Sequence, residues 1–242
     1  MPQSTISPAD LGLHANAVPM RNPPLWNRGR ALDGVGGDYK CLGRTLFRSI
    51  LELRCRRLLS ADKDVLEFAV ESHQLKYRIP TSPHDHSSAI YTPDITVRYR
   101  DGRIVVVEAK AEFFANKPYW KSHRPFIQDA YEVDHGIGFI VKTEWDINAQ
   151  PALSNSEIML RYRYRYRSAD GEDALRRMRM VLATYQPPAT IRELIAVSGI
   201  QSPDCQDLGF AALMNLALWG EVDFDPTLPI TYETRVIWGA IE

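Results

Sequence analysis

Residues 91–110 read YTPDITVRYRDGRIVVVEAK, and this stretch decides the fold. A β-branched run at 95–99 and an almost continuous apolar run at 104–107 are typical of two strands. Between them stands Asp101-Gly102, a dipeptide that favours a tight hairpin turn. The sequence therefore predicts a buried antiparallel hairpin.

Three charged side chains mark the open end of this predicted hairpin. Facing positions of adjacent strands have Cβ atoms roughly 5 Å apart, so we expect Asp94 close to Glu108. With a two-residue loop Asp94 would face Ala109 instead, and a bulge or the strand twist must then complete the convergence. Lys110 points to the same face as Glu108 because side chains repeat every second residue. Two carboxylates and an ammonium cost too much desolvation to be idle core residues, and they suit a hard divalent cation and phosphodiester cleavage.

The composition is that of an ordinary globular protein. The 242 residues are 45% hydrophobic and 24% charged, which is enough for one large domain or two small ones. The formal net charge of −1 means that contact with nucleic acid must rest on local clusters of Arg and Lys. Three widely spaced cysteines argue against a disulfide framework or a zinc site. Without an apolar leader or spanning segment, we expect a soluble, cytoplasmic protein.

Patterns around the hairpin predict an α/β domain over residues 39–148, a mixed sheet flanked by helices. The expected elements are, in order, a helix (43–60), one or two strands (65–79), a polar loop (80–88), the hairpin, a helix (118–132) and a strand (139–141). Residues 1–38 are rich in proline and glycine, which predicts an irregular N-terminal arm. This arm is either a solvated tail or a segment that contacts DNA or a partner.

After residue 148 the chain becomes mostly helical. The expected elements are helices at 155–166 (capped by Asn155), 172–183, 191–197 (capped by Thr190) and 207–219, and strands at 222–224 and 232–238. Three helices followed by a strand pair are typical of a winged helix. We therefore predict a winged-helix-like C-terminal domain over residues 149–242.

Alternating arginines and tyrosines fill residues 161–167. As a strand, this repeat would place arginines on one face and tyrosines on the other. As a helix, it would bury Tyr162 and Tyr166 and turn the arginines outward, and the expected cap at Asn155 favours the helix. Such a basic, aromatic segment fits DNA, an acidic partner surface, or simply a solvated face.

Pro-Asp before a strand and Glu-x-Lys at the end of its partner strand form the motif of the PD-ExK nuclease superfamily. Four longer runs resemble the TnsA endonuclease family of heteromeric transposons: Ser49-Ile50-Leu51-Glu52, Asp62-Lys63-Asp64-Val65, Tyr91-Thr92-Pro93-Asp94 and Lys142-Thr143-Glu144-Trp145-Asp146-Ile147. The resemblance covers roughly residues 40–148, and the C-terminal half more loosely. It implies a restriction-endonuclease-like fold.

The same resemblance implies a DNA endonuclease that cuts the 5′ ends of a transposon. Its implied partners are a DDE transposase of the TnsB type, which cuts and joins the 3′ ends, and an AAA+ ATPase of the TnsC type, which regulates both. Whether an RNA-guided targeting complex takes part is left open. Two other functions remain as alternatives, a stand-alone restriction or repair nuclease and a non-catalytic DNA-binding adaptor.

The family's catalytic positions fall on Glu52, Asp94, Glu108 and Lys110. Asp94 is the candidate to bridge metals, and Glu108 with the Ala109 carbonyl would complete an oxygen shell for one or two Mg²⁺ (or Mn²⁺) ions. Lys110 would orient or help to deprotonate the attacking water and offset charge on the phosphorane.

Glu52 would be an outer metal ligand, but it could instead form an ion pair with Arg48 or Arg56 on its own helix. Candidates for DNA contact are basic or polar and lie outside this site, because phosphate contacts dominate affinity for DNA. They are Lys117, Lys121, Arg124, Gln128, Arg161, Arg163 and Arg165.

Overall fold

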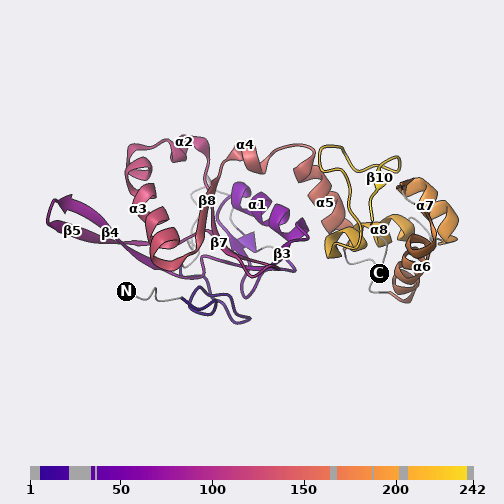
Figure 1. Ribbon diagram of the computed structural model, residues 1–242, viewed down its shortest axis with the longest axis horizontal. Coiled ribbons are helices and arrows are strands. Elements are labelled where there is room, and N and C mark those ends of the chain that lie inside the picture. The colour runs from indigo at the N-terminus through magenta and orange to yellow at the C-terminus, as the bar shows by residue number, and fades with distance from the viewer. Residues whose placement is uncertain are drawn as a thin grey trace. The chain divides into compact units, whose positions relative to one another are not determined.

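The computed structural model describes residues 6–21, 34–35, 37–163, 168–186, 188–201 and 207–238. The chain divides into two compact units (Figure 1). The first consists of Met1–Arg56 and Asp64–Asn148, and the second consists of Arg57–Lys63 and Ala149–Glu242. The second unit thus includes the last part of the first helix as well as the C-terminal segment.

The first unit is built on a four-stranded sheet in the order β3-β6-β7-β8. Its strands are β3 (Val65–Val70), β6 (Ile95–Tyr99), β7 (Ile104–Ala109) and β8 (Gly138–Lys142). The pairs β3·β6 and β6·β7 are antiparallel, whereas β8 runs parallel to β7. The predicted α/β class with a mixed sheet is confirmed.

The described residues of this unit contain, wholly or in part, the helices α1 (Ile50–Ala61), α2 (Glu112–Ala115), α3 (Pro118–His135) and α4 (Glu144–Ile147). Helix α3 packs on the sheet through a core that includes Ile127, Tyr131, Val106 and Phe139. It ends at Gly136, whose φ of 67° is the left-handed conformation of a helix C-cap.

The predicted helix over 43–60 is wrong at its start. Residues Leu46–Phe47 form a short strand, β2, which pairs with β1 (Gly34–Val35). Helix α1 begins only at Ile50, because the Ser49 Oγ accepts a hydrogen bond from the Glu52 N–H (3.1 Å), the pattern of a helix N-cap. An N-cap signal was therefore present in the sequence but did not enter the prediction.

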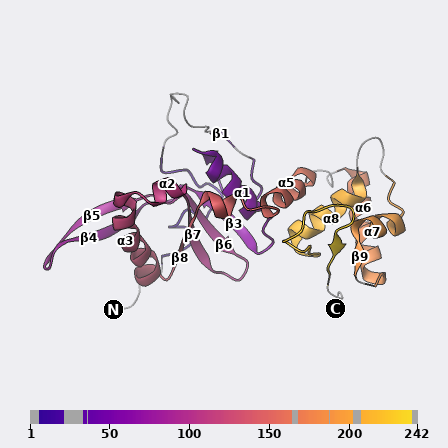
Figure 2. The same cartoon turned by 90° about the horizontal axis from the view of Figure 1, so that it is seen from above.

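The predicted polar loop at 80–88 is also wrong. Strands β4 (Leu75–Ser82) and β5 (Asp85–Tyr91) pair in register across it and form a hairpin. This hairpin extends past α3 and away from the four-stranded sheet (Figures 1 and 2). Its outer residues are exposed, so polar side chains occupy both strands at no desolvation cost.

The β6–β7 hairpin has a different register from the one expected. Ile95 faces Val107, which places Asp94 opposite Glu108. The Tyr99 N–H donates to the Arg103 carbonyl (2.9 Å), so the loop has three residues, and Gly102 in it has a φ of 90°. The predicted two-residue loop is wrong, and neither a bulge nor extra twist is required.

Residues 6–21 of the N-terminal arm are irregular, as predicted, but they are not a solvated tail. Leu11 joins the core beneath α3, and its carbonyl accepts a hydrogen bond from the Ser72 Oγ (2.6 Å). A Cβ on the neighbouring Gly12, which has a φ of 72°, would lie 2.5 Å from the Ser72 Cβ. Only glycine allows the arm to approach this closely.

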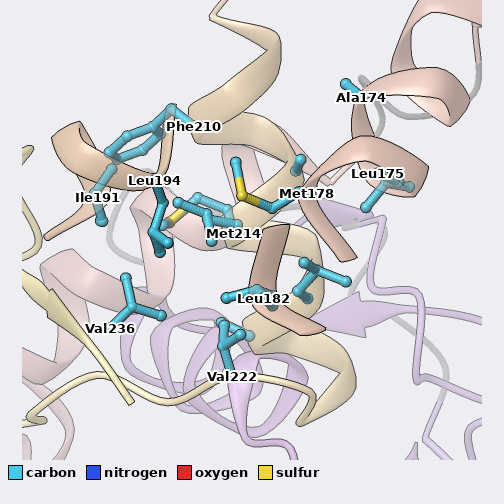
Figure 3. Close-up of a cluster of buried hydrophobic side chains, with 14 of the residues drawn as sticks. Ala174, Leu175, Met178, Leu182, Ile191, Leu194, Phe210, Met214, Val222 and Val236 are labelled. Atoms are coloured by element: carbon cyan, nitrogen blue, oxygen red, sulfur yellow. The ribbon is translucent and has the colours of Figure 1, made fainter. Parts of the chain in front are cut away.

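The second unit is a helical core around α8 (Leu208–Trp219). Helices α5 (Ala152–Tyr162), α6 (Ala169–Thr184) and α7 (Ile191–Ser198) all contact α8, and its residues 208–218 are all buried. Figure 3 shows Met178, Leu194 and Met214 at the centre of this apolar cluster. The cap predicted at Thr190 is confirmed, since the Thr190 Oγ1 accepts a hydrogen bond from the Glu193 N–H (3.2 Å).

Asn155 does not cap α5, contrary to the prediction. Asn155 is buried and belongs to the first turn of α5. Its side-chain Nδ2 donates to the Leu228 carbonyl, and its Oδ1 accepts from the Ile230 N–H (both 2.9 Å). The helix begins instead at Ala152. A side chain chosen as a local cap therefore secures a distant loop, which local sequence patterns cannot reveal.

The predicted C-terminal strand pair is only partly present. Strand β10 (Arg235–Val236) pairs with β9 (Ala189–Thr190), the two residues that precede α7. A single antiparallel bridge joins Asp223 to Ile237. Within the described residues from 149 onward the order is therefore helix, helix, strand, helix, helix, bridge and strand.

The arginine–tyrosine repeat begins at the end of α5. Arg161 is exposed and Tyr162 packs against the α8 core, as the helical alternative expects. Arg163 is buried, however, and does not turn outward. Residues 164–167, with Arg165 and Tyr166, lie outside the described residues.

The cysteines and helices of the described part of the chain show two further features. Cys41 and Cys55 are free thiols. None of the helices described is long and apolar enough to cross a membrane.

Candidate active site

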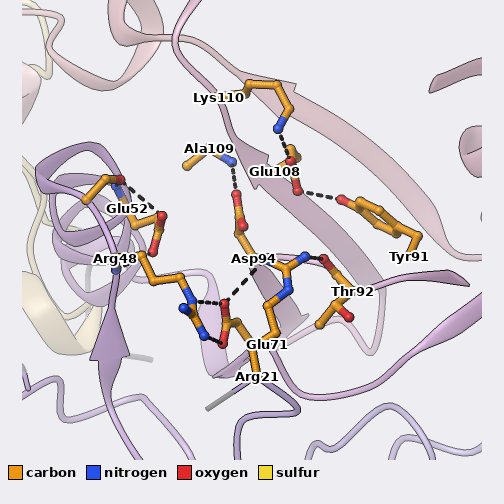
Figure 4. A network of polar contacts seen from close by, with 11 residues as sticks. Arg21, Arg48, Glu52, Glu71, Tyr91, Thr92, Asp94, Glu108, Ala109 and Lys110 are labelled. Atoms are coloured by element: carbon orange, nitrogen blue, oxygen red, sulfur yellow. Dashed lines mark hydrogen bonds and ion pairs between the residues drawn. The ribbon is translucent and has the colours of Figure 1, made fainter. Parts of the chain in front are cut away.

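Asp94 and Glu108 meet at the open end of the β6–β7 hairpin. Asp94 precedes β6 and faces Glu108 near the end of β7. One Asp94 oxygen, Oδ2, accepts a hydrogen bond from the Ala109 N–H (2.9 Å). The hairpin register and this bond together fix the two carboxylates side by side (Figure 4).

Glu108 is 4% exposed and has a partner for each oxygen. The Tyr91 hydroxyl donates to Oε2 (2.5 Å), and the Lys110 Nζ lies 2.6 Å from Oε1. Desolvation and the negative charges of Glu108 and Asp94 raise the pKa of Tyr91 well above its usual value, so this hydroxyl remains a donor. Tyr91 had no role in the sequence-based prediction.

Lys110 stands beside an aromatic ring as well as beside Glu108. Its Nζ lies 4.3 Å from the centre of the Trp120 ring, and its side chain keeps 23% of its surface exposed. The Lys110 N–H donates to the Lys142 carbonyl on β8 (3.0 Å). The ammonium is thus held by a carboxylate and a π face at the edge of the solvent.

The carboxyl group of Asp94 has a strongly shifted pKa. Asp94 is partly exposed as a residue, yet burial of its carboxyl group, followed by the charges of Glu108 and Glu52, raises its pKa well above the usual value. Lys110 and the Ala109 N–H act in the opposite direction but do not compensate. A perturbed carboxyl group next to a second carboxylate is typical of functional sites.

Glu52 belongs to the electrostatic surroundings of Asp94 but faces its own helix start. Its oxygens accept hydrogen bonds from the Arg48 N–H (2.8 Å) and the Ser49 hydroxyl (3.1 Å). Burial is the largest cause that raises its pKa. Of the two alternative partners, Arg48 does bond Glu52, through its backbone N–H, while its guanidinium pairs with Glu71. Arg56 pairs with Asp38.

An ion network behind Asp94 was missed from the sequence. Buried Glu71 accepts hydrogen bonds from Arg48 Nε (2.6 Å) and Arg21 (3.4 Å), and its N–H donates to the Asp94 carbonyl (2.9 Å). Arg21, from the N-terminal arm, also donates to the carbonyl of Thr92 (2.7 Å). In Figure 4, Glu71 and Arg21 lie on the side of Asp94 that faces away from Ala109.

Glu71 has a φ of 44°, unusual for a residue with a side chain. No sequence signal identifies it, because its partners Arg48 and Arg21 lie 23 and 50 positions away.

The predicted DNA-contact residues occupy three kinds of place. Lys117, Lys121 and Arg124 are exposed and lie at or near the start of α3 in the first unit. The Gln128 side-chain Nε2 donates to the Glu132 carboxylate, four residues later on α3 (3.1 Å). Arg161 is exposed in the second unit.

The donor set of the site is small. Among the described residues no group of three or more His, Cys, Asp or Glu side chains is placed to hold a metal ion. Asp94 and Glu108 supply two carboxylates, and the carbonyl of Ala109, the residue after Glu108, could supply a third oxygen. Mg²⁺ is commonly bound by one or two carboxylates together with waters, so this set is sufficient for it.

The geometry therefore joins three of the four predicted catalytic residues closely and places the fourth, Glu52, within their electrostatic reach. In comparisons with known proteins, no protein-family model and no curated protein matches this chain.

Proposed function

We propose that the protein is a Mg²⁺-dependent DNA endonuclease of the TnsA type, the subunit that cuts the 5′ ends of a transposon. The observation that carries the proposal is the cluster of Asp94, Glu108 and Lys110 at one end of β6 and β7. Restriction-endonuclease-like proteins use this combination on this kind of hairpin. The mixed sheet with α3 packed on it is compatible with that fold.

Asp94, Glu108 and the Ala109 carbonyl would hold the metal. Burial and the nearby charge of Glu108 disfavour the charge on Asp94, as its raised pKa indicates, so a divalent cation placed there would be stabilised. Mn²⁺ would fit the same oxygen ligands, and the site could take one ion or two. The bound ion would supply Lewis acidity toward the phosphate and a more acidic water.

Lys110 would act on the phosphate and the attacking water. Glu108 and Trp120 fix its ammonium where the site opens to solvent. There it would orient the water and offset the negative charge that develops on the phosphorane. Glu52 would act from further out, because its oxygens already bond the start of α1.

DNA would lie across the start of α3. Lys117, Lys121 and Arg124 place three cations there, close in sequence to Lys110. They would contact backbone phosphates, which position a duplex without reading its sequence. Arg161 is a further candidate in the second unit.

We propose a winged-helix-like fold for the second unit. Its order of elements supports this, since β10 pairs with β9 and its neighbour Ile237 pairs with Asp223. Helix α8 takes the place of the recognition helix, but residues 208–218 are buried and include no charged side chain. This favours a protein partner, such as a TnsC-type ATPase, over base reading by α8.

The test is 5′-end cutting of transposon-end DNA together with the DDE transposase and the ATPase. Asp94→Ala and Lys110→Ala should abolish it while circular dichroism and thermal unfolding show an intact fold. Asp129→Ala, an exposed aspartate on α3, is the matched control and should cut normally. Full excision by both site variants would overturn the proposal in favour of a DNA-binding adaptor.

A stand-alone restriction or repair nuclease is the second enzyme candidate. It shares the site, so only its dependence on partners separates it from the TnsA type. Efficient cutting of arbitrary DNA by the purified protein alone would favour it.

A further inference from the structure

A pocket of about 640 Å³ opens in the first unit just beyond the strand that carries Lys110. Helix α2 and the start of α3 form most of its wall, and α4 closes one side. Its lining residues are Glu112, Phe113, Asn116, Lys117, Pro118 and Glu144. None of them belongs to the proposed catalytic set.

Exposed aromatic side chains distinguish this part of the surface. Phe113 and Phe114 are 65% and 59% exposed, with ring centres 5.2 Å apart, and Trp145 on α4 is 72% exposed. The Lys117 Nζ lies 4.0 Å from the centre of the Phe113 ring. Open aromatic faces of this size are unfavourable in water and mark binding surfaces when they cluster.

The polar groups of the pocket fit the edge of a base. Glu112 Oε2 accepts from the Trp145 indole N–H, and Glu144 Oε2 accepts from the Glu112 N–H (both 2.5 Å). These bonds fix both carboxylates and use one oxygen of each, so the other can accept from an exocyclic amino group. The side-chain amide of Asn116, an exposed residue, adds a donor and an acceptor.

We propose that this pocket receives one unpaired nucleobase of the DNA strand next to the scissile phosphate. The base would stack on Phe113, its edge would meet Asn116 and a carboxylate, and its phosphate would lie near Lys117. Aromatic stacking beside a cation is the general means of binding unpaired nucleotides. The proposal rests on the proposed function, because Lys110 precedes Phe113 by only three residues and brings the DNA to this edge.

The experiment compares two fluorescently labelled duplexes in the presence of Ca²⁺, which allows binding without cutting. One duplex is fully paired, and the other has one unpaired base beside the expected cut. The full-length protein should bind the second more tightly. Phe113→Ala should weaken binding of that duplex roughly 5- to 100-fold, the range of one base–aromatic stack, and leave the paired duplex unchanged.

Two variants complete the design. Phe113→Trp keeps a stacking face and should keep the preference. Val133→Ala removes an exposed apolar side chain at the other end of α3 and should behave as the wild type. Unfolding curves of all variants confirm that binding is compared between folded proteins.

Three results would overturn the proposal that the pocket binds a base. The wild type could bind both duplexes equally, or Phe113→Ala could weaken binding of both duplexes equally. Alternatively, Phe113→Ala could bind DNA normally but fail to assemble with the transposase. The last result would assign the aromatic surface to a protein partner. A different result would contradict the proposed function alone. In that case the wild type, with Mg²⁺ and its partners, does not cut DNA, yet it still prefers the duplex with the unpaired base in a way that depends on Phe113. Cutting without any preference would retain the function and reject the pocket.

Discussion

The open end of the β6–β7 hairpin and the core around α8 are built in opposite ways. At the hairpin, Asp94 and Glu108 lie together, and the pKa of Asp94 is raised by burial and by Glu108. Around α8, the cluster consists of aliphatic, aromatic and methionine side chains, with Leu213 and Met214 fully buried (Figure 3).

The difference separates stability from function. Apolar burial around α8 stabilises the second unit by roughly 1.5–3 kcal/mol for each large side chain. The raised pKa of Asp94 means that ionisation of this one carboxyl group disfavours folding of the first unit at neutral pH, so other contacts must hold it in place. Substitutions in the two regions should therefore have opposite consequences for activity and for folding.

The largest effect is expected at Glu108. Glu108→Gln removes the charge that we propose binds the metal, together with the ion-pair partner of Lys110. If the proposed function holds, 5′-end cutting should fall about a thousandfold or more, equivalent to several kcal/mol of transition-state stabilisation. Urea unfolding should change by less than about 1 kcal/mol. Glu132→Gln, an exposed carboxylate on α3, is the control. Cutting at the wild-type rate by Glu108→Gln would show that the Glu108 carboxylate takes no part in the reaction.

The second effect belongs to the α8 core. Leu213→Ala should lower the free energy of unfolding of the second unit by about 2–5 kcal/mol, because a cavity replaces a fully buried side chain. Cutting at low temperature by the folded protein should be retained. Leu228→Ala, 55% exposed in the same unit, should cost less than about 0.5 kcal/mol. Equal losses from both variants would show that α8 is not the core of this unit.

Much of the fold was predictable wherever the signal is local. The hairpin and the cap of α7 at Thr190 each depend on residues within a few positions of one another. The register of the β6–β7 hairpin was not predictable, because a three-residue loop and a two-residue loop can both accommodate Asp101-Gly102. The prediction that Asn155 caps α5 failed for a different reason. Its side-chain amide forms hydrogen bonds with Leu228 and Ile230, and no local pattern connects these residues to Asn155.

The candidate site divides in the same way. Asp94, Glu108 and Lys110 follow from a short motif, and the structure brings them together. Glu71 and Arg21 could not be predicted, because their role depends on how the N-terminal arm folds back on the end of β3.

A third, smaller effect is expected at Tyr91. Tyr91→Phe removes the donor to Glu108 Oε2 and leaves a buried carboxylate oxygen without its partner. The free energy of unfolding should fall by about 1–3 kcal/mol, and more Mg²⁺ should be needed for half-maximal cutting. Tyr119→Phe, 70% exposed, is the control and should change neither quantity. An unchanged Mg²⁺ requirement would mean that Tyr91 serves packing alone.

The smallest effect is a gain in stability at Asp94. Because its pKa is raised on folding, ionisation is harder in the folded chain, and the wild type loses stability as the pH rises from the unfolded-state pKa through the folded-state pKa. Asp94→Asn cannot ionise, so without divalent cations it should melt higher than the wild type at pH 8. A gain of about 1 kcal/mol corresponds to roughly 2–4 °C in a protein of this size. The gain should vanish in acid, below both pKa values.

The matched control for this gain has the opposite sign. Hydrogen bonds from Arg103 lower the pKa of exposed Asp101, so its charge is favourable in the folded state and is lost as the pH falls. Asp101→Asn should therefore melt slightly lower than the wild type at pH 8 and equally in acid. Added Mg²⁺ should raise the melting temperature of the wild type and of Asp101→Asn, but not that of Asp94→Asn. If Asp94→Asn instead melts below the wild type at pH 8 without metal, the carboxylate pair stabilises the fold, and the contrast with the α8 core is lost.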